Sequence, residues 1–129
     1  MGIAQRRKGA AGERELANLL AEHLGGDVVR NLEQTRSGGH DLVGVDPFAI
    51  EVKRHETLAI PAWWRQACDQ SPSDMIPALA YRQSRRPWRF VLPLELLIDQ
   101  EWPRDYALTC EVGVEGFCYI AREIIADAA

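Results

Sequence analysis

The chain has 129 residues, 47% of them hydrophobic and 26% charged, and its formal net charge is −4. This length and composition predict a single globular domain over residues 1–129 and leave no room for a second one. No segment approaches the roughly 20 apolar residues of a membrane helix, and no apolar run follows the basic N-terminus. We therefore expect a cytoplasmic protein without a membrane partner.

Cysteine and glycine patterns exclude two kinds of site. The three cysteines lack Cys-x-x-Cys spacing, which favours buried thiols over a disulfide framework or a zinc site. The chain contains neither Gly-x-Gly-x-x-Gly nor a Walker sequence, so we expect no nucleotide cofactor.

The first elements are a basic arm and a helix. Residues 1–9 are predicted to be a flexible arm whose cations contact phosphates, with a frayed, solvated terminus as the alternative. A helix is predicted from about Ala10 to Leu24, ended by Gly25-Gly26. Glu13 lies near the leucine stripe of this helix, where an unpaired carboxylate is costly unless a partner such as a metal ion or a lysine compensates its charge. Glu15 and Glu22 are expected to be ordinary surface acids.

After this helix, residues 27–31 are predicted to form a strand. Residues 32–39 are rich in small polar residues and are predicted to form a loop that either lies over a phosphate or only connects two elements.

Residues 39–53 are predicted to form a β-hairpin, because β-formers are interrupted there only by Asp46-Pro47. Side-chain alternation puts Glu51 and Lys53 on one face of the second strand. A two-residue turn would place Asp41 opposite Val52, whereas a three-residue loop or a bulge would place it opposite Glu51.

Only the second register brings two carboxylates and a lysine together. Such a set suits metal-assisted hydrolysis of phosphodiesters, since carboxylate oxygens hold Mg²⁺ and an ammonium can orient a water molecule. The alternative is a hairpin whose outward face carries solvated charges.

The remaining pattern predicts a mixed sheet with helices on both faces. A helix is expected from Ile60 through Ala67, in which either Trp63 or Trp64 fills the core and the other is exposed to a base or a partner subunit. The other predicted elements are strands at 76–81 and 88–92 around a basic turn at 82–87, a short helix at 93–97, strands at 106–112 and 117–119, and a terminal helix at 121–128. The basic turn is expected to be either a solvated loop or a second patch that contacts the nucleic-acid backbone.

Several motifs together resemble the PD-(D/E)XK nuclease superfamily, and within it the archaeal-type Holliday junction resolvases. They are Lys8 to Leu16 with its Glu-Arg-Glu, Val28-Val29-Arg30, Ser37 ahead of Asp41, and Ile50-Glu51-Val52-Lys53. The similarity covers roughly residues 6–70 and implies an α/β fold with a restriction-endonuclease-like core, a central mixed β-sheet flanked by helices. His40 stands where the superfamily name has Pro, and the acidic C-terminal part has no match.

The resemblance implies catalytic roles for Glu13, Asp41, Glu51 and Lys53. We expect Asp41, Glu51 and the backbone carbonyl of Val52 to bind Mg²⁺ or Mn²⁺ with Glu13 nearby, and Lys53 to position the attacking water. The residues expected to contact DNA are Arg6, Arg7, Lys8, Arg14, Arg30, Arg36, Ser37, Arg54, Arg65 and Gln66.

The predicted function is therefore metal-dependent DNA cleavage, selective for branched DNA. A less selective phage or host-defence endonuclease, a catalytically idle nucleic-acid binder and an interaction protein are the alternatives. The first 89 residues carry 13 Lys/Arg and 11 Asp/Glu, whereas the last 40 carry two and eight, which makes the basic face small for a resolvase. Two symmetric cuts imply a homodimer, with Trp63 or Trp64 and parts of Trp88 and Trp102 as candidates for its interface.

Overall fold

A mixed β-sheet forms the centre of the computed structural model, which describes residues 3–32, 40–98 and 106–128, and only the backbone of 3–8 and 128. Six strands of the described residues follow one another in chain order across the sheet. Only β3 and β4 are parallel to each other; all other neighbours are antiparallel. The strands are β1 (Val29–Arg30), β2 (Leu42–Val43), β3 (Phe48–Arg54), β4 (Ile76–Arg82), β5 (Arg89–Pro93) and β6 (Thr109–Gly113).

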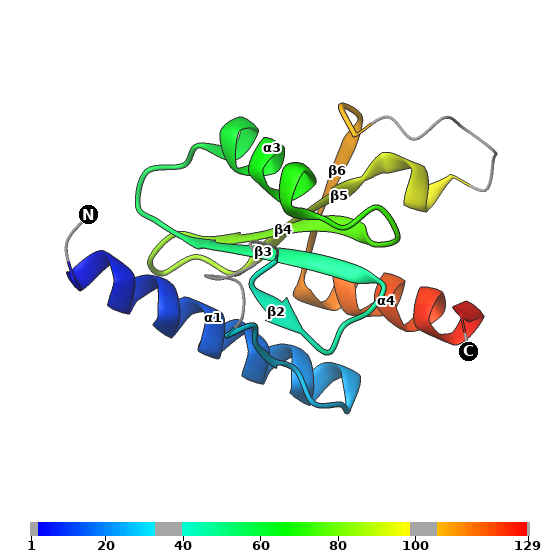
Figure 1. Ribbon diagram of the computed structural model, residues 1–129, viewed down its shortest axis with the longest axis horizontal. Helices are drawn as coiled ribbons and strands as arrows, with labels where there is room; N and C mark the ends of the chain where they lie inside the picture. The colour runs from blue at the N-terminus through cyan, green and yellow to red at the C-terminus, as the bar shows by residue number, and fades with distance from the viewer. Residues whose placement is uncertain (1–2, 33–39, 99–105, 129) are drawn as a thin grey trace.

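Helices cover both faces of this sheet, as predicted (Figure 1). The first face carries α1 (Ile3–Leu24) and α4 (Val114–Ala128), and the second carries α3 (Ile60–Gln70), which makes the crossover between the parallel strands β3 and β4. A 3₁₀ helix, η1 (Leu94–Leu97), follows β5. The α/β class with a mixed sheet is thus confirmed.

Two apolar clusters hold the layers together. One joins leucines of α1 and Phe117 of α4 to Phe48 and Ile50 of β3, and the other joins Trp63 and Trp64 of α3 to β4. Because both faces of β3 are covered, its first five residues are all buried. Polar side chains on this strand are therefore held in a largely apolar interior.

The hairpin adopts the register that brings the acids together. Leu42 pairs with Ile50, and the Asp41 amide donates a hydrogen bond to the Ile50 carbonyl at 2.8 Å. Asp41 therefore lies opposite Glu51, as the odd-numbered loop requires, and the alternative with Val52 opposite Asp41 is excluded.

Two predicted element boundaries are wrong. The segment expected to be a flexible arm is helical from Ile3, because Ala, Gln, Arg and Lys are good helix formers and continue α1 toward the N-terminus. Residues 117–119, expected in a strand, belong to α4, which begins directly after β6. There Phe117, Cys118 and Ala121 form a buried helical stripe that the strand pattern does not reveal.

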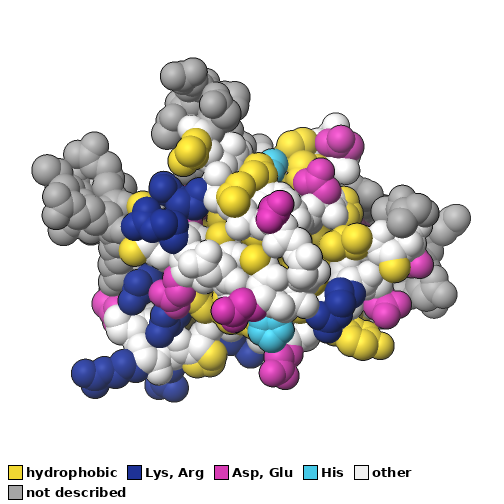
Figure 2. Space-filling view, turned by 90° about the horizontal axis from the view of Figure 1, so that it is seen from below, with side chains coloured by type: hydrophobic (Ala, Val, Ile, Leu, Met, Phe, Trp, Pro, Cys, Tyr) yellow, Lys and Arg dark blue, Asp and Glu magenta, His cyan; other side chains and the backbone are white. Residues whose placement is uncertain are grey.

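Charge is distributed unevenly over the face formed by α1 and α4. Most visible Lys and Arg side chains gather toward the end where α1 begins, whereas acidic side chains are scattered over the rest (Figure 2). Within the described residues, no helix is both long and apolar enough to cross a bilayer.

Candidate active site

A pocket of about 540 Å³ opens where α1, the hairpin and the loop after β3 meet. It contains all four side chains expected to be catalytic, although they come from α1, the hairpin and β3. Its lining residues are Gly9, Glu13, Asp41, Glu51, Val52, Lys53, Arg54, His55, Glu56 and Thr57.

A pair of buried carboxyl groups forms the floor of this pocket. Asp41 and Glu51 are only 7% and 4% exposed, and their side chains share a hydrogen bond. The Val52 amide donates to Asp41 Oδ2 at 2.7 Å, and Gln66 Nε2 on α3 donates to Glu51 Oε1 at 3.0 Å. Both acids are thus oriented by fixed donors.

Burial alters the acidity of this pair. Loss of solvation, followed by repulsion from Asp41, raises the pKa of Glu51 to about 8. Loss of solvation is also the main cause that raises the pKa of Asp41 to about 6. Two adjacent acids that resist ionisation in this way would be stabilised as carboxylates by a nearby cation.

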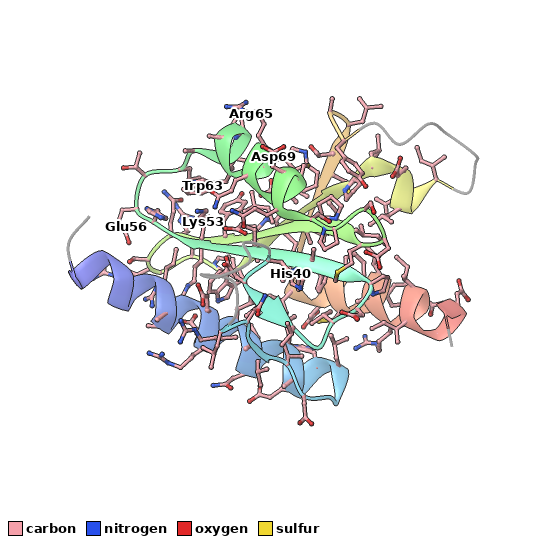
Figure 3. The ribbon with its side chains drawn as sticks, in the orientation of Figure 1. His40, Lys53, Glu56, Trp63, Arg65 and Asp69 are labelled. Atoms are coloured by element: carbon pink, nitrogen blue, oxygen red, sulfur yellow. The ribbon has the colours of Figure 1, made fainter. Side chains whose placement is uncertain are left out.

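Two of the acids that line the pocket have a cationic group beside them. The Lys53 ammonium is 3.8 Å from Glu51 Oε1, and Lys53 points into the region between α1 and α3 (Figure 3). Glu13 is buried, as expected, but Arg30 Nε donates to its Oε2 at 2.8 Å. An arginine on β1 therefore compensates the charge for which the sequence suggested a metal ion or a lysine.

The donor set fits a hard divalent cation. No three His, Cys, Asp or Glu side chains of the described residues converge as a metal cluster, so the candidate ligands are two carboxylates, from Asp41 and Glu51, together with the Val52 carbonyl. Oxygen donors of this kind suit Mg²⁺ or Mn²⁺, and Mg²⁺ commonly uses only one or two protein carboxylates. Glu13 is held by Arg30 and stands farther out, close enough for its charge to contribute to the raised pKa of Asp41.

The predicted DNA contacts are only partly brought together. Arg54 lines the pocket, and Gln66 is connected to it by its hydrogen bond to Glu51. Arg14 and Arg30 line a separate hollow between α1 and β1. Arg65 lies on the outer face of α3, away from the sheet (Figure 3). Arg36 and Ser37 lie outside the described residues, as do the side chains of Arg6, Arg7 and Lys8.

Glu15 is not the ordinary surface acid that was expected. Its carboxylate binds the guanidinium of Arg82, accepts a hydrogen bond from Trp88 Nε1 at 3.0 Å, and lies 3.6 Å from Arg54 Nη1. The sequence contained one signal for this network. Alternation places Arg54 on the core-facing side of β3 under α1, where a guanidinium requires an acidic partner.

The expectation of one exposed tryptophan in α3 is also wrong. Trp63 and Trp64 are both buried: Trp63 packs against Tyr81, and Trp64 packs against Tyr106, whose carbonyl accepts a hydrogen bond from Trp64 Nε1 at 2.6 Å. The Trp63 ring instead supports His55 of the pocket wall, with ring centroids 5.3 Å apart.

Two kinds of comparison with known proteins give matches, one with protein families and one with solved structures. A family model described as a phage putative PDDEXK endonuclease matches residues 4–111. The solved structure of Hjc, a Holliday junction resolvase from the archaeal hyperthermophile Archaeoglobus fulgidus, is 23% identical and has a TM-score of 0.49, with 84% of this chain and 85% of that chain covered. This second likeness concerns the fold and carries no information about substrate. No curated protein matches the chain.

Proposed function

The chain belongs to the phage putative PDDEXK endonuclease family, and from this membership we propose that it cleaves DNA by metal-dependent hydrolysis in the pocket between α1 and the hairpin. One observation carries the proposal: Asp41, Glu51 and Lys53, three residues with the chemistry that phosphodiester hydrolysis needs, converge with Glu13 in one pocket. The superfamily motif by itself would allow a catalytically idle relative, but these positions are all occupied by reactive groups.

Each side chain has a distinct task in this proposal. Asp41, Glu51 and the Val52 carbonyl would hold a divalent cation, Mg²⁺ or Mn²⁺, whose Lewis acidity would offset the negative charge that grows on the phosphate. The Lys53 ammonium orients the attacking water, whose oxygen forms the new bond to phosphorus while the bond to the leaving oxygen breaks. The attacking water loses its proton to solvent, and the leaving oxygen takes one up. Gln66 and the Val52 amide keep the two carboxyl groups in place.

Single substitutions test the catalytic roles. Asp41→Asn, Glu51→Gln and Lys53→Met should each lower the rate of DNA cleavage by roughly 10²- to 10³-fold or more, the scale on which removal of one charge-stabilising group acts. DNA affinity should fall much less, because phosphate contacts supply most of it. Glu22→Gln, the same change on the exposed face of α1, is the matched control. Full activity in EDTA or in Glu51→Gln would refute the mechanism.

The proposed substrate is branched DNA. This choice rests on the resolvase-like motifs from Lys8 to Lys53. Membership in the phage endonuclease family is equally compatible with a less selective endonuclease, which is the alternative. A cleavage assay distinguishes these two functions. The purified protein is given Mg²⁺ and, in parallel, labelled four-way junction, flap, linear duplex and single-stranded DNA. Paired symmetric nicks confined to the junction support selectivity for branches, and equal cutting of linear duplex supports the alternative.

A further inference from the structure

The turn between β4 and β5 is strongly basic. From Ile76 to Leu94 the chain contains four arginines and no acidic residue. Arg85 and Arg86 at the tip of this turn are exposed. The turn lies at the same end of the molecule as the start of α1 and the loop between β3 and α3 (Figure 1), where basic side chains gather (Figure 2).

Several hydrogen bonds join this turn to the wall of the pocket. The His55 amide donates to the Arg82 carbonyl at 3.1 Å, and Gln83 Nε2 donates to the Glu56 carbonyl at 2.8 Å. The Ser84 amide and hydroxyl both donate to Glu56 Oε1. Because His55 and Glu56 line the pocket, the position of the turn relative to the pocket is defined.

Arg82 stabilises the turn by bonding to its backbone and to α1. Its Nε donates to the Arg86 carbonyl at 2.8 Å, while its Nη1 binds Glu15 on α1. The Arg86 amide in turn donates to the Gln83 carbonyl at 3.1 Å. One arginine thus serves the architecture of the turn, and the two at its tip present their charge to solvent.

The backbone at Arg85 adopts a conformation that suits glycine better than arginine. Arg85 has a φ of 64°, in the left-handed region that glycine occupies far more easily than residues with a Cβ atom. An arginine in such a conformation at a turn tip beside a functional pocket points to a use for its charge.

We propose that Arg85 and Arg86 bind backbone phosphates of DNA next to the phosphate that is cleaved, so that the β4–β5 turn guides the nucleic acid into the pocket. This inference rests on the proposed nuclease function and extends it to a surface outside the motif. Exposed arginines on an anchored turn suit such contacts, since guanidinium groups pair with phosphates in a sequence-independent way.

The test compares Arg85→Gly and Arg86→Gln with the natural chain. Affinity for a labelled four-way junction and a labelled duplex is measured in EDTA over a series of salt concentrations, together with the melting temperature. Each variant should bind roughly two- to tenfold more weakly, and the slope of log affinity against log salt should become shallower by about one. Arg85→Gly should keep or raise the melting temperature, because glycine relieves the backbone conformation.

Arg122→Gln is the matched control. It removes the same charge from α4, where Arg122 Nη1 donates to the His23 carbonyl near the other end of α1. Its affinity and salt slope should stay unchanged. Unchanged binding by Arg85→Gly and Arg86→Gln, or an equal loss in Arg122→Gln, would overturn the role of the turn while leaving the nuclease proposal intact. Absence of DNA binding by the natural chain would overturn the proposed function and this inference with it.

Discussion

Asp41 and Glu51 occupy positions that reduce the stability of the metal-free protein. A buried acid whose pKa is raised in the folded state stays protonated there, while the unfolded chain releases its proton at lower pH. For Glu51 the two values are about 8 and 4.5, and for Asp41 about 6 and 3.8. Unfolding therefore releases protons between about pH 4 and pH 8, and rising pH favours the unfolded chain across this window.

The raised pKa values of Asp41 and Glu51 predict a pH dependence of stability that Glu51→Gln should weaken. In EDTA, the melting temperature of the natural chain should fall from pH 5 to pH 8, with a loss of unfolding free energy on the order of a few kcal/mol. Glu51→Gln keeps an acceptor for Gln66 and removes the titrating group, so its melting temperature at pH 8 should be higher. Thermal unfolding at both pH values measures the effect, with Glu22→Gln as control. A melting temperature that rises with pH would contradict it.

The ion pair between Glu13 and Arg30 should contribute to the stability of the fold. The two side chains are 11% and 28% exposed, so Arg30→Leu leaves a nearly buried carboxylate without its main partner. We expect a loss of about 1–3 kcal/mol of unfolding free energy. Adding Glu13→Gln to Arg30→Leu should restore part of this loss. Chemical denaturation of the natural chain, both single variants and the double variant measures the coupling between the two residues. Strictly additive effects would show that the pair is not coupled.

Among the elements, the hairpin decides whether the site exists, and its loop depends on one glycine. Gly44 has a φ of 105°, and a Cβ atom at this position would lie 2.1 Å from the Asp27 carbonyl oxygen. The segment that leads into β1 therefore packs directly against the hairpin loop. Any shift of this loop would move Asp41 relative to Glu51, since only a short strand separates Gly44 from Asp41.

Gly44→Ala should accordingly destabilise the fold by roughly 2–4 kcal/mol, through the left-handed backbone and the steric overlap together. Gly26→Ala is the matched control, because open space surrounds that position. Urea denaturation of both variants provides the measurement. Equal stability of Gly44→Ala and the natural chain would show that the loop can move away from Asp27 without cost.

For the whole molecule, the structure removes three of the four tryptophans that were candidates for the homodimer interface. Trp63, Trp64 and Trp88 are buried within the chain, and Trp102 lies outside the described residues. Exposed apolar side chains of the described residues include Leu97 at the end of η1, Ile98 directly after it, and Leu108 before β6. A dimer would need a surface other than Trp63, Trp64 and Trp88.

We still predict a homodimer in solution, because two symmetric cuts at a junction require two active sites related by a two-fold axis. Sedimentation at micromolar concentration should give about twice the chain mass of 14.5 kDa. A single 14.5 kDa species, with or without a DNA junction, would refute the dimer.

The sequence by itself determined the hairpin, the identity of its reactive side chains and the order of most elements. These features follow from local rules: alternation in strands, the helical period and the residues that break both. The odd loop was one of two options that the sequence left open, and the backbone pairing of Leu42 with Ile50 selected it. The superfamily resemblance rested on the same local motifs.

Only the tertiary structure decided which charged groups pair and which aromatic rings are covered. Glu15 meets Arg82 across 67 positions of sequence, and Trp64 meets Tyr106 across 42. Such contacts depend on how α1 and α3 lie on opposite faces of the sheet, which no local period encodes. The partner of Glu13 was hidden for the same reason, because Arg30 reaches it only after β1 joins the sheet at the hairpin.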